Sequence, residues 1–135
     1  MSVIRSKRNE SDMQFLHTAM ELHVFTIKKC KKLFPKAYTF SIANHMVDSA
    51  AHIHRYVVKA NSIYPLNQRE VQIRRNHFLE AYTELQWMIS QMEVAYELLH
   101  FDTQDMNEWT EIVNKEMKLI SGTMKKDRER YKNLS

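Results

Sequence analysis

Residues 78–99 read FLEAYTELQWMISQMEVAYELL, and they contain the most regular hydrophobic pattern in the 135-residue chain. Large apolar side chains recur there at alternating steps of four and three residues, which places them along one face of an α-helix. The members of this seam are Phe78, Tyr82, Leu85, Ile89, Met92, Tyr96 and Leu99. Such a seam is typical of a left-handed packed bundle, in a helix of roughly 30 residues and about 45 Å.

Two further amphipathic segments precede this helix, and each of them ends at a proline. Pro35 and Pro65 end them because proline disfavours helical geometry in the residue before it. The first is expected to start at a capping box formed by Ser11 and Gln14, and the second near residues 39–41. The stripe of the first is Leu16, Met20, His23, Ile27, Cys30 and Phe34. The stripe of the second is Ile42, Met46, Ala50, Ile53, Val57, Ala60 and Tyr64.

A fourth amphipathic segment follows the central helix. Asn67 with Glu70 is the expected cap of the central helix, and Asp105 with Glu108 is the expected cap of the fourth. The stripe of the fourth segment is Met106, Trp109, Val113, Met117, Ile120 and Met124. Because Gly122 weakens the end of this helix, the residues after it are expected to fray.

The order of these segments predicts the fold. Four amphipathic helices joined by tight links run antiparallel to their sequential neighbours. The sequence therefore predicts an all-α, up-and-down antiparallel four-helix bundle over residues 11–135, after a flexible basic tail at residues 1–10. A long helical hairpin that exchanges between chains is the structural alternative.

The composition excludes several other classes of protein. One glycine and two prolines are too few for a fold built on β-hairpins, which need many turn residues. No apolar run approaches the roughly 18–20 residues of a membrane span, and the N-terminus lacks the pattern of a secretory signal. Cys30 is the only cysteine, which excludes an internal disulfide and fits the reducing cytoplasm. We therefore expect a cytoplasmic protein without membrane contact.

The residues that carry catalysis or bind metals do not converge in the sequence. Glu97-x-x-His100 matches the motif of di-iron bundles, but such a site needs two of these motifs and two more inward glutamates. His52 and His54 are two residues apart and cannot share a helix face. Cys30 lies in an apolar stripe, where an unpaired cysteine acts as a small hydrophobe. We expect no catalytic residues, no metal and no cofactor, and hence a protein that is not an enzyme.

Basic residues gather at one end of the predicted bundle, where the tail, the link between the second and third helices, and the C-terminus meet. Clustered lysines and arginines attract phosphate groups, so this end is the expected site for RNA or DNA. The residues proposed to bind nucleic acid there are Arg55, Lys59, Arg69, Arg74, Arg75, Lys125, Lys126 and Arg128. The opposite end adds Lys28, Lys32 and Lys36. Tyr56 and Tyr131 can add stacking on single-stranded bases. The competing interpretation is a solvated surface whose ion pairs contribute little.

Residues 76–111 show the opposite charge, because they contain eight acidic side chains and no lysine or arginine. The pattern places Trp87 on the face of the central helix opposite its seam, together with Glu80, Glu84 and Gln91. An exposed aromatic residue alone is common, but tryptophan is enriched at interface hot spots. Trp87 is therefore a candidate contact with another subunit or a partner.

Short motifs in this order also resemble one family of small bacterial proteins. They are Lys32-Leu33-Phe34-Pro35-Lys36, then Ile42-Ala43-Asn44, then Arg74-Arg75-x-x-Phe78-Leu79-Glu80-Ala81, and finally Tyr96-Glu97-Leu98-Leu99. The chain resembles the 23S rRNA intervening-sequence proteins and the accessory variability determinant (Avd) proteins of diversity-generating retroelements. The resemblance covers roughly residues 13–125.

This resemblance implies a homo-oligomer, namely a barrel-like homopentamer with a basic surface for nucleic acid. An Avd-like protein would bind the retroelement reverse transcriptase and its template RNA or cDNA, and it would support cDNA synthesis without chemistry of its own. The alternative is a structural or protein-interaction bundle that forms a homo-oligomer and binds no nucleic acid.

Overall fold

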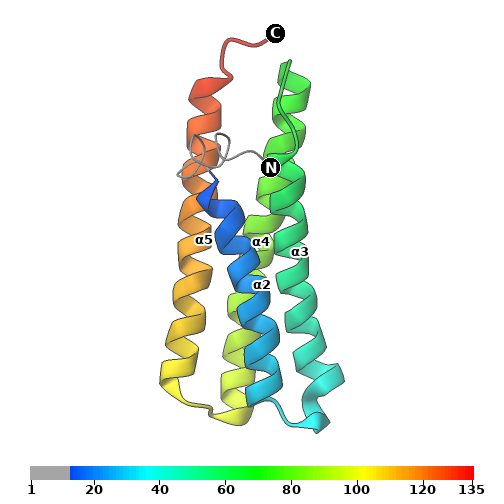
Figure 1. The fold of residues 1–135 in the computed structure, drawn as a ribbon, viewed down its shortest axis with the longest axis vertical. Helices are drawn as coiled ribbons and strands as arrows, with labels where there is room; N and C mark the ends of the chain where they lie inside the picture. Colours follow the sequence, from blue (N-terminus) through cyan, green and yellow to red (C-terminus); the bar gives the residue numbers. More distant parts are fainter. Residues whose placement is uncertain (1–12) are drawn as a thin grey trace, which may run out of the picture.

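The computed structural model describes residues 13–135, which form four long α-helices (Figure 1). They are α2 (Gln14–Leu33), α3 (Asn44–Asn61), α4 (Gln68–Leu99) and α5 (Thr103–Arg130). Each helix runs antiparallel to the next, so the predicted all-α, up-and-down four-helix bundle is confirmed. The predicted tail at residues 1–10 and the Ser11 cap lie outside the described residues.

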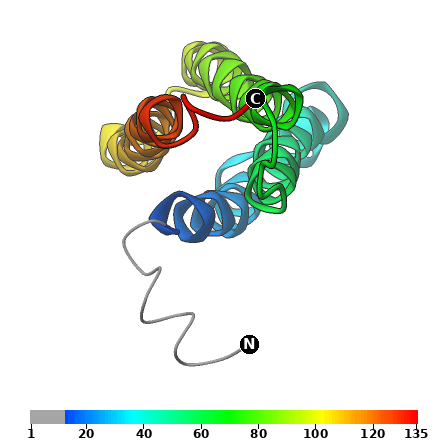
Figure 2. The ribbon, with the colours of Figure 1, turned by 90° about the horizontal axis from the view of Figure 1, so that it is seen from above.

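The helices form a square in which each contacts its two neighbours (Figure 2). Both α2 and α4 pack against α3 and against α5. We call the end where α3 and α5 finish and α4 begins the upper end, as drawn in Figure 1. At this end α4 and α5 extend past α2, because α2 has 20 residues whereas α4 has 32 and α5 has 28. The opposite end, which holds the α2–α3 and α4–α5 links, is the lower end.

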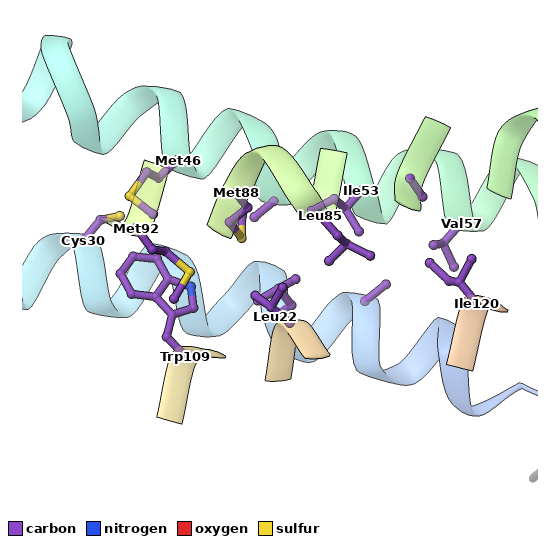
Figure 3. Packing of buried hydrophobic residues seen from close by; sticks show 14 of the residues in the cluster. Leu22, Cys30, Met46, Ile53, Val57, Leu85, Met88, Met92, Trp109 and Ile120 are labelled. Atoms are coloured by element: carbon purple, nitrogen blue, oxygen red, sulfur yellow. The ribbon is translucent and has the colours of Figure 1, made fainter. Parts of the chain in front are cut away.

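Aliphatic, aromatic and sulfur-containing side chains from all four helices fill the interior (Figure 3). Leu22, Ile53 and Leu85 are fully buried in it, and Trp109 lies beside the methionines of the lower half. The indole Nε1 of Trp109 donates a hydrogen bond to Thr26 Oγ1 at 3.1 Å, so its polar atom is satisfied inside the core. Burial of these side chains is the main source of stability in such a bundle.

The predicted stripes of α3, α4 and α5 lie inward for the most part, with Tyr64 exposed at the end of the second. The stripe predicted for α2 is wrong in part. Cys30 is buried, and Leu16 and Phe34 pack against the core, but Met20 and Ile27 are each 46% exposed. The interior face of α2 is instead formed by Phe15, Thr18, Ala19, Leu22, Thr26 and Cys30. Thr18, Ala19 and Thr26 on this face are small or polar, so the face does not stand out as hydrophobic in the sequence.

Helix ends also show where local signals succeed and where they fail. Asn67 caps α4 as predicted, since its side chain accepts a hydrogen bond from the Glu70 N–H at 2.9 Å. The cap predicted at Asp105 is wrong, because Asp102 caps α5 by accepting from the Gln104 N–H at 2.8 Å. The segment after Gly122, where we expected fraying, is helical as far as Arg130.

The link from α2 to α3 is helical for most of its length. A 3₁₀ turn at Lys36–Tyr38 and a π-helical turn at Thr39–Ala43 lead directly into α3. The predicted start of the second helix near residues 39–41 therefore falls within this π turn.

Candidate nucleic-acid interface

The last turns of α3 and α5 and the first turns of α4 bring together, at the upper end, basic residues that are far apart in sequence. We call the surface formed by these basic side chains the basic end surface. Its exposed members are Arg55, Lys59, Arg69, Lys125, Lys126, Arg128, Arg130 and Lys132, and Arg75 is half-buried among them. Glu70 and Glu129 are the accompanying carboxylates among the described residues that are not buried. The surface therefore has a strong excess of positive charge, which suits phosphate groups.

Arg74 does not belong to this surface, so its prediction as a nucleic-acid-binding residue is wrong. It is 6% exposed, and its Nε donates to Asp127 Oδ2 at 2.7 Å. Its Nη1 donates to the carbonyl oxygens of Ala60 and Ile63, both at 3.1 Å. Arg74 thus joins α4 to α5 and to the C-terminal end of α3. Its guanidinium satisfies buried acceptors and is not directed at solvent.

Two hollows flank this buried ion pair. One of about 250 Å³ lies between the start of α2 and α5, and Lys118, Lys126 and Arg130 are among its lining residues. The other, of about 430 Å³, lies between α4 and α5, with Arg75, Arg128, Lys132 and Tyr131 in its lining. The second hollow combines cations with an aromatic ring, the combination that single-stranded nucleic acid uses in protein grooves.

The two tyrosines predicted to stack on bases differ in their surroundings. Tyr56 already packs on His52, with ring centroids 4.6 Å apart, and the ammonium of Lys59 lies 4.8 Å from its centroid. Tyr131 lies at the second hollow, where Gln68 Nε2 donates to its carbonyl oxygen at 2.7 Å. Tyr131 is therefore the better-placed ring for stacking.

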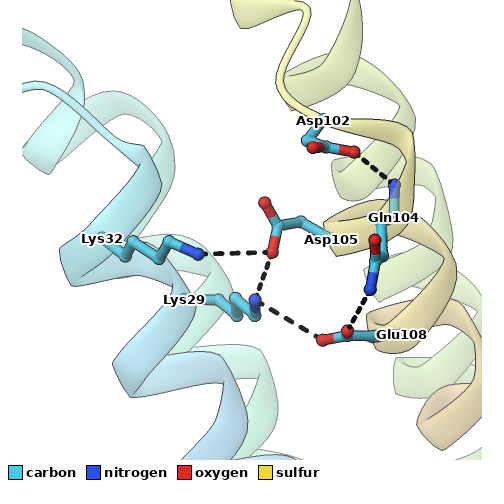
Figure 4. Close-up of polar contacts among 6 residues, drawn as sticks. All are labelled: Lys29, Lys32, Asp102, Gln104, Asp105 and Glu108. Atoms are coloured by element: carbon cyan, nitrogen blue, oxygen red, sulfur yellow. Dashed lines mark hydrogen bonds and ion pairs between the residues drawn. The ribbon is translucent and has the colours of Figure 1, made fainter.

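The lower end also contains lysines, but acidic residues of α5 face them (Figure 4). Lys29 pairs with Asp105 and lies 3.6 Å from Glu108, and Lys32 lies 3.6 Å from Asp105. The hydrogen bond from Lys29 holds the pKa of Asp105 below its usual value, and the same contact raises the pKa of Lys29. Lys28 and Lys36 remain exposed beside this network. The lower end is thus partly neutralised within the chain.

Trp87 is 57% exposed on α4, as the pattern predicted. Its expected companions Glu84 and Gln91 lie beside it but contact α3, because Gln91 is buried and donates through Nε2 to Ser49 Oγ at 2.8 Å. Glu84 accepts from the same Ser49 hydroxyl at 2.8 Å. The side of α4 that carries Trp87 therefore borders α3 instead of lying opposite the core.

Residues 13–135 contain no group of three or more histidine, cysteine, aspartate or glutamate side chains placed to hold a metal. His23, in the stripe predicted for the first helix, is half-buried, and its Nδ1 lies 3.0 Å from Nδ1 of His54. Burial, and then the nearby His23, lower the pKa of His54. Burial raises the pKa of the Cys30 thiol to about 12, so this side chain is not a thiolate at neutral pH.

Glu116 is a buried group that the sequence reading missed. It is fully buried on α5, and neither carboxyl oxygen has a hydrogen-bond partner among the described residues. Burial raises its pKa to about 9, so the carboxyl is protonated at neutral pH. Its position three residues after Val113 and four before Ile120 is the signal that would have placed it inside.

Comparisons with protein-family models, with curated proteins and with solved structures found no match to this chain. Within residues 13–135, no helix has both the length and the apolar character that crossing a membrane requires. The surfaces described above are therefore the basis for a proposal of function.

Proposed function

We propose that this chain is a non-enzymatic accessory protein that binds RNA or DNA through its basic end surface. One observation carries the proposal: three helix ends gather eight exposed cations and the half-buried Arg75 at one end of the bundle. Five of these nine line the two hollows, namely Lys126 and Arg130 in the first and Arg75, Arg128 and Lys132 in the second. Phosphate contacts of this kind provide affinity without sequence reading, through charge attraction and counterion release.

The resemblance to Avd proteins suggests which nucleic acid and which protein partner this chain would bind. By that resemblance the nucleic acid is the template RNA or cDNA of a diversity-generating retroelement, and the protein partner is its reverse transcriptase. The basic end surface would hold the nucleic acid, while other faces of the bundle remain available for protein contacts.

A salt titration with single-stranded RNA tests the binding surface. We expect the logarithm of affinity to fall with the logarithm of salt concentration at a slope of about −3 or steeper, which corresponds to four or more phosphate contacts. The double variant Arg75→Gln and Arg128→Gln removes two cations from the second hollow, and it should flatten the slope by about 1.4. The matched variant Lys28→Gln and Lys36→Gln removes two exposed cations at the lower end and should leave the slope unchanged. A slope near zero in the wild type would sink the proposal.

A second candidate is a homo-oligomer that serves as a structural or interaction module, and one observation favours it. Met20, Val24 and Ile27 form an exposed apolar stripe on α2, and an isolated monomer gains nothing from such a stripe. We propose that this stripe is a contact between copies, in a pentamer if the Avd resemblance holds. Sedimentation velocity of Val24→Glu should show a smaller particle than the wild type, while Val58→Glu, an exposed valine on α3, should not change the mass.

A further inference from the structure

A groove of about 470 Å³ runs between α3 and α4 in the lower half of the bundle, away from the basic end surface. On the α3 side, His45, Asp48 and His52 line it at steps of three and four residues. The α4 side is lined by Glu84, Trp87, Gln91 and Val94 at steps of three, four and three. Both walls thus present a continuous helical face to the same space.

The charge of this groove is negative and unbalanced. Residues 37–54, which include its α3 wall, contain no lysine or arginine, and neither do residues 76–111, which include its α4 wall. Asp48 and Glu84 line the groove, and Glu80 lies beside it, 3.3 Å from His52 Nε2. Cations are thus absent from both stretches apart from histidines, which carry charge only when protonated. The acidic groups lack the lysine partners that neutralise Asp105 at the lower end.

The carboxylate of Glu84 is held in place by hydrogen bonds to buried side chains. Gln91 Nε2 donates to Ser49 Oγ at 2.8 Å, and the Ser49 hydroxyl donates to Glu84 Oε2 at 2.8 Å. Ser49 and Gln91 are both buried, so this chain of hydrogen bonds forms the floor of the groove. The other oxygen of Glu84 lies 3.9 Å from His52 Nε2. A carboxylate held in a fixed position at the edge of a groove is suited to an arginine or lysine side chain.

Trp87 supplies the other half of the recognition. It lies one helical turn after Glu84 on the same face, and 57% of it is exposed. Among aromatic rings, tryptophan attracts cations most strongly through its face. A cationic side chain in this groove would contact both the indole ring and the Glu84 carboxylate. Val94, which is also exposed, would pack against its aliphatic stem.

We propose that this groove binds an arginine- or lysine-rich segment of a partner protein. The negative charge of both walls repels nucleic acid, so RNA and this partner would occupy different faces of the bundle at the same time. The inference stands on the groove alone and does not rest on the proposed RNA binding.

Binding of a hexa-arginine amide peptide, measured by fluorescence anisotropy with nuclease-treated protein, tests the proposal. Trp87→Ala and Glu84→Gln should each weaken binding about tenfold, because each removes one of the two contacts with the cation. The matched control Glu111→Gln makes the same charge change at an exposed position of α5 and should alter affinity less than twofold. A hexa-citrulline amide, which keeps the shape but not the charge, should not bind. Equal effects of Glu84→Gln and Glu111→Gln would mean that the peptide binds only through non-specific charge attraction, and they would overturn the proposal.

Two further measurements separate this site from the others. The Trp87→Ala variant should keep the RNA affinity and the sedimentation coefficient of the wild type. If Trp87→Ala lowers the sedimented mass, a second copy of the chain covers the groove and the proposal is wrong. Conversely, Arg75→Gln with Arg128→Gln should leave peptide binding unchanged, so failure of one site is visible independently of the other.

Discussion

The two ends of the bundle are both rich in lysine and arginine, yet they use these residues differently. At the upper end, Arg74 and Asp127 form a buried pair that joins α4 to α5, and the surrounding cations face solvent. At the lower end, the pair that joins α2 to α5 is formed by Lys29 and Asp105, close to the surface, and Lys32 lies beside it. Lysines at the lower end thus pair with acidic residues, whereas the exposed cations at the upper end have few acidic residues near them. Density of positive charge in a sequence therefore does not by itself show how far acidic neighbours neutralise that charge in the fold.

Breaking the upper pair should have the largest effect on stability. Arg74→Ala leaves Asp127 buried without its partner, and removing one member of such a pair costs about 3–5 kcal/mol. The free energy of unfolding from urea denaturation measures this loss. Arg75→Ala, the neighbouring arginine, should change stability by less than about 0.5 kcal/mol. The double variant Arg74→Met with Asp127→Leu should recover most of the loss, and equal stability of Arg74→Ala and Arg75→Ala would contradict the assignment.

Glu116 differs from both of these ion pairs, because its buried carboxyl has no hydrogen-bond partner among the described residues. Its pKa is about 9 in the folded chain against the ordinary 4.5, so between these values the unfolded chain releases its proton first. Stability from this group therefore falls as pH rises from about 4.5 towards 9. The stability gained by Glu116→Met should grow by roughly 3 kcal/mol between pH 4.5 and pH 7. Urea denaturation of both proteins across this range measures the difference, and a gain that does not vary with pH would mean that the carboxyl is ionised in the fold.

Breaking the lower pair should have the smallest effect. Lys29→Met removes the contacts with Asp105 and Glu108, and pairs close to solvent contribute little to stability. Added salt screens such charges, so the difference from the wild type should shrink at about 1 M NaCl. Thermal or urea denaturation at low and high salt gives the comparison with Arg74→Ala. A loss as large as that of Arg74→Ala would show that the two ends are held in the same way.

The fold could be predicted because large apolar side chains repeat along α3, α4 and α5. The stripe of α2 could not, since its inner face uses Thr18, Ala19 and Thr26, which hydrophobicity does not distinguish from surface residues. Met20 and Ile27 are large and apolar but exposed, so a pattern based on hydrophobicity assigns them wrongly to the inner face. The π turn before α3 has no clear sequence signal either.

The candidate site was predictable in outline but not in detail. Antiparallel order alone brings the basic segments to one end, yet the choice between Arg74 and Arg75 depends on helix phase. Arg74 lies four residues before Phe78 and so continues the buried seam, a signal that the charge of the residue does not carry. The network of Ser49, Glu84 and Gln91 depends on contacts between two helices, which periodicity within one helix cannot show.

The most direct test of the account compares charge reversal at the two ends in one RNA-binding assay. Each variant carries four Lys/Arg→Glu substitutions: Arg75, Lys125, Lys126 and Arg128 at the upper end, or Lys28, Lys31, Lys32 and Lys36 at the lower end. Both variants change the net charge equally, and circular dichroism confirms that each is folded. We expect a loss of affinity of about 100-fold or more for the upper-end variant and at most about threefold for the lower-end variant. Equal losses, or a larger loss at the lower end, would contradict it.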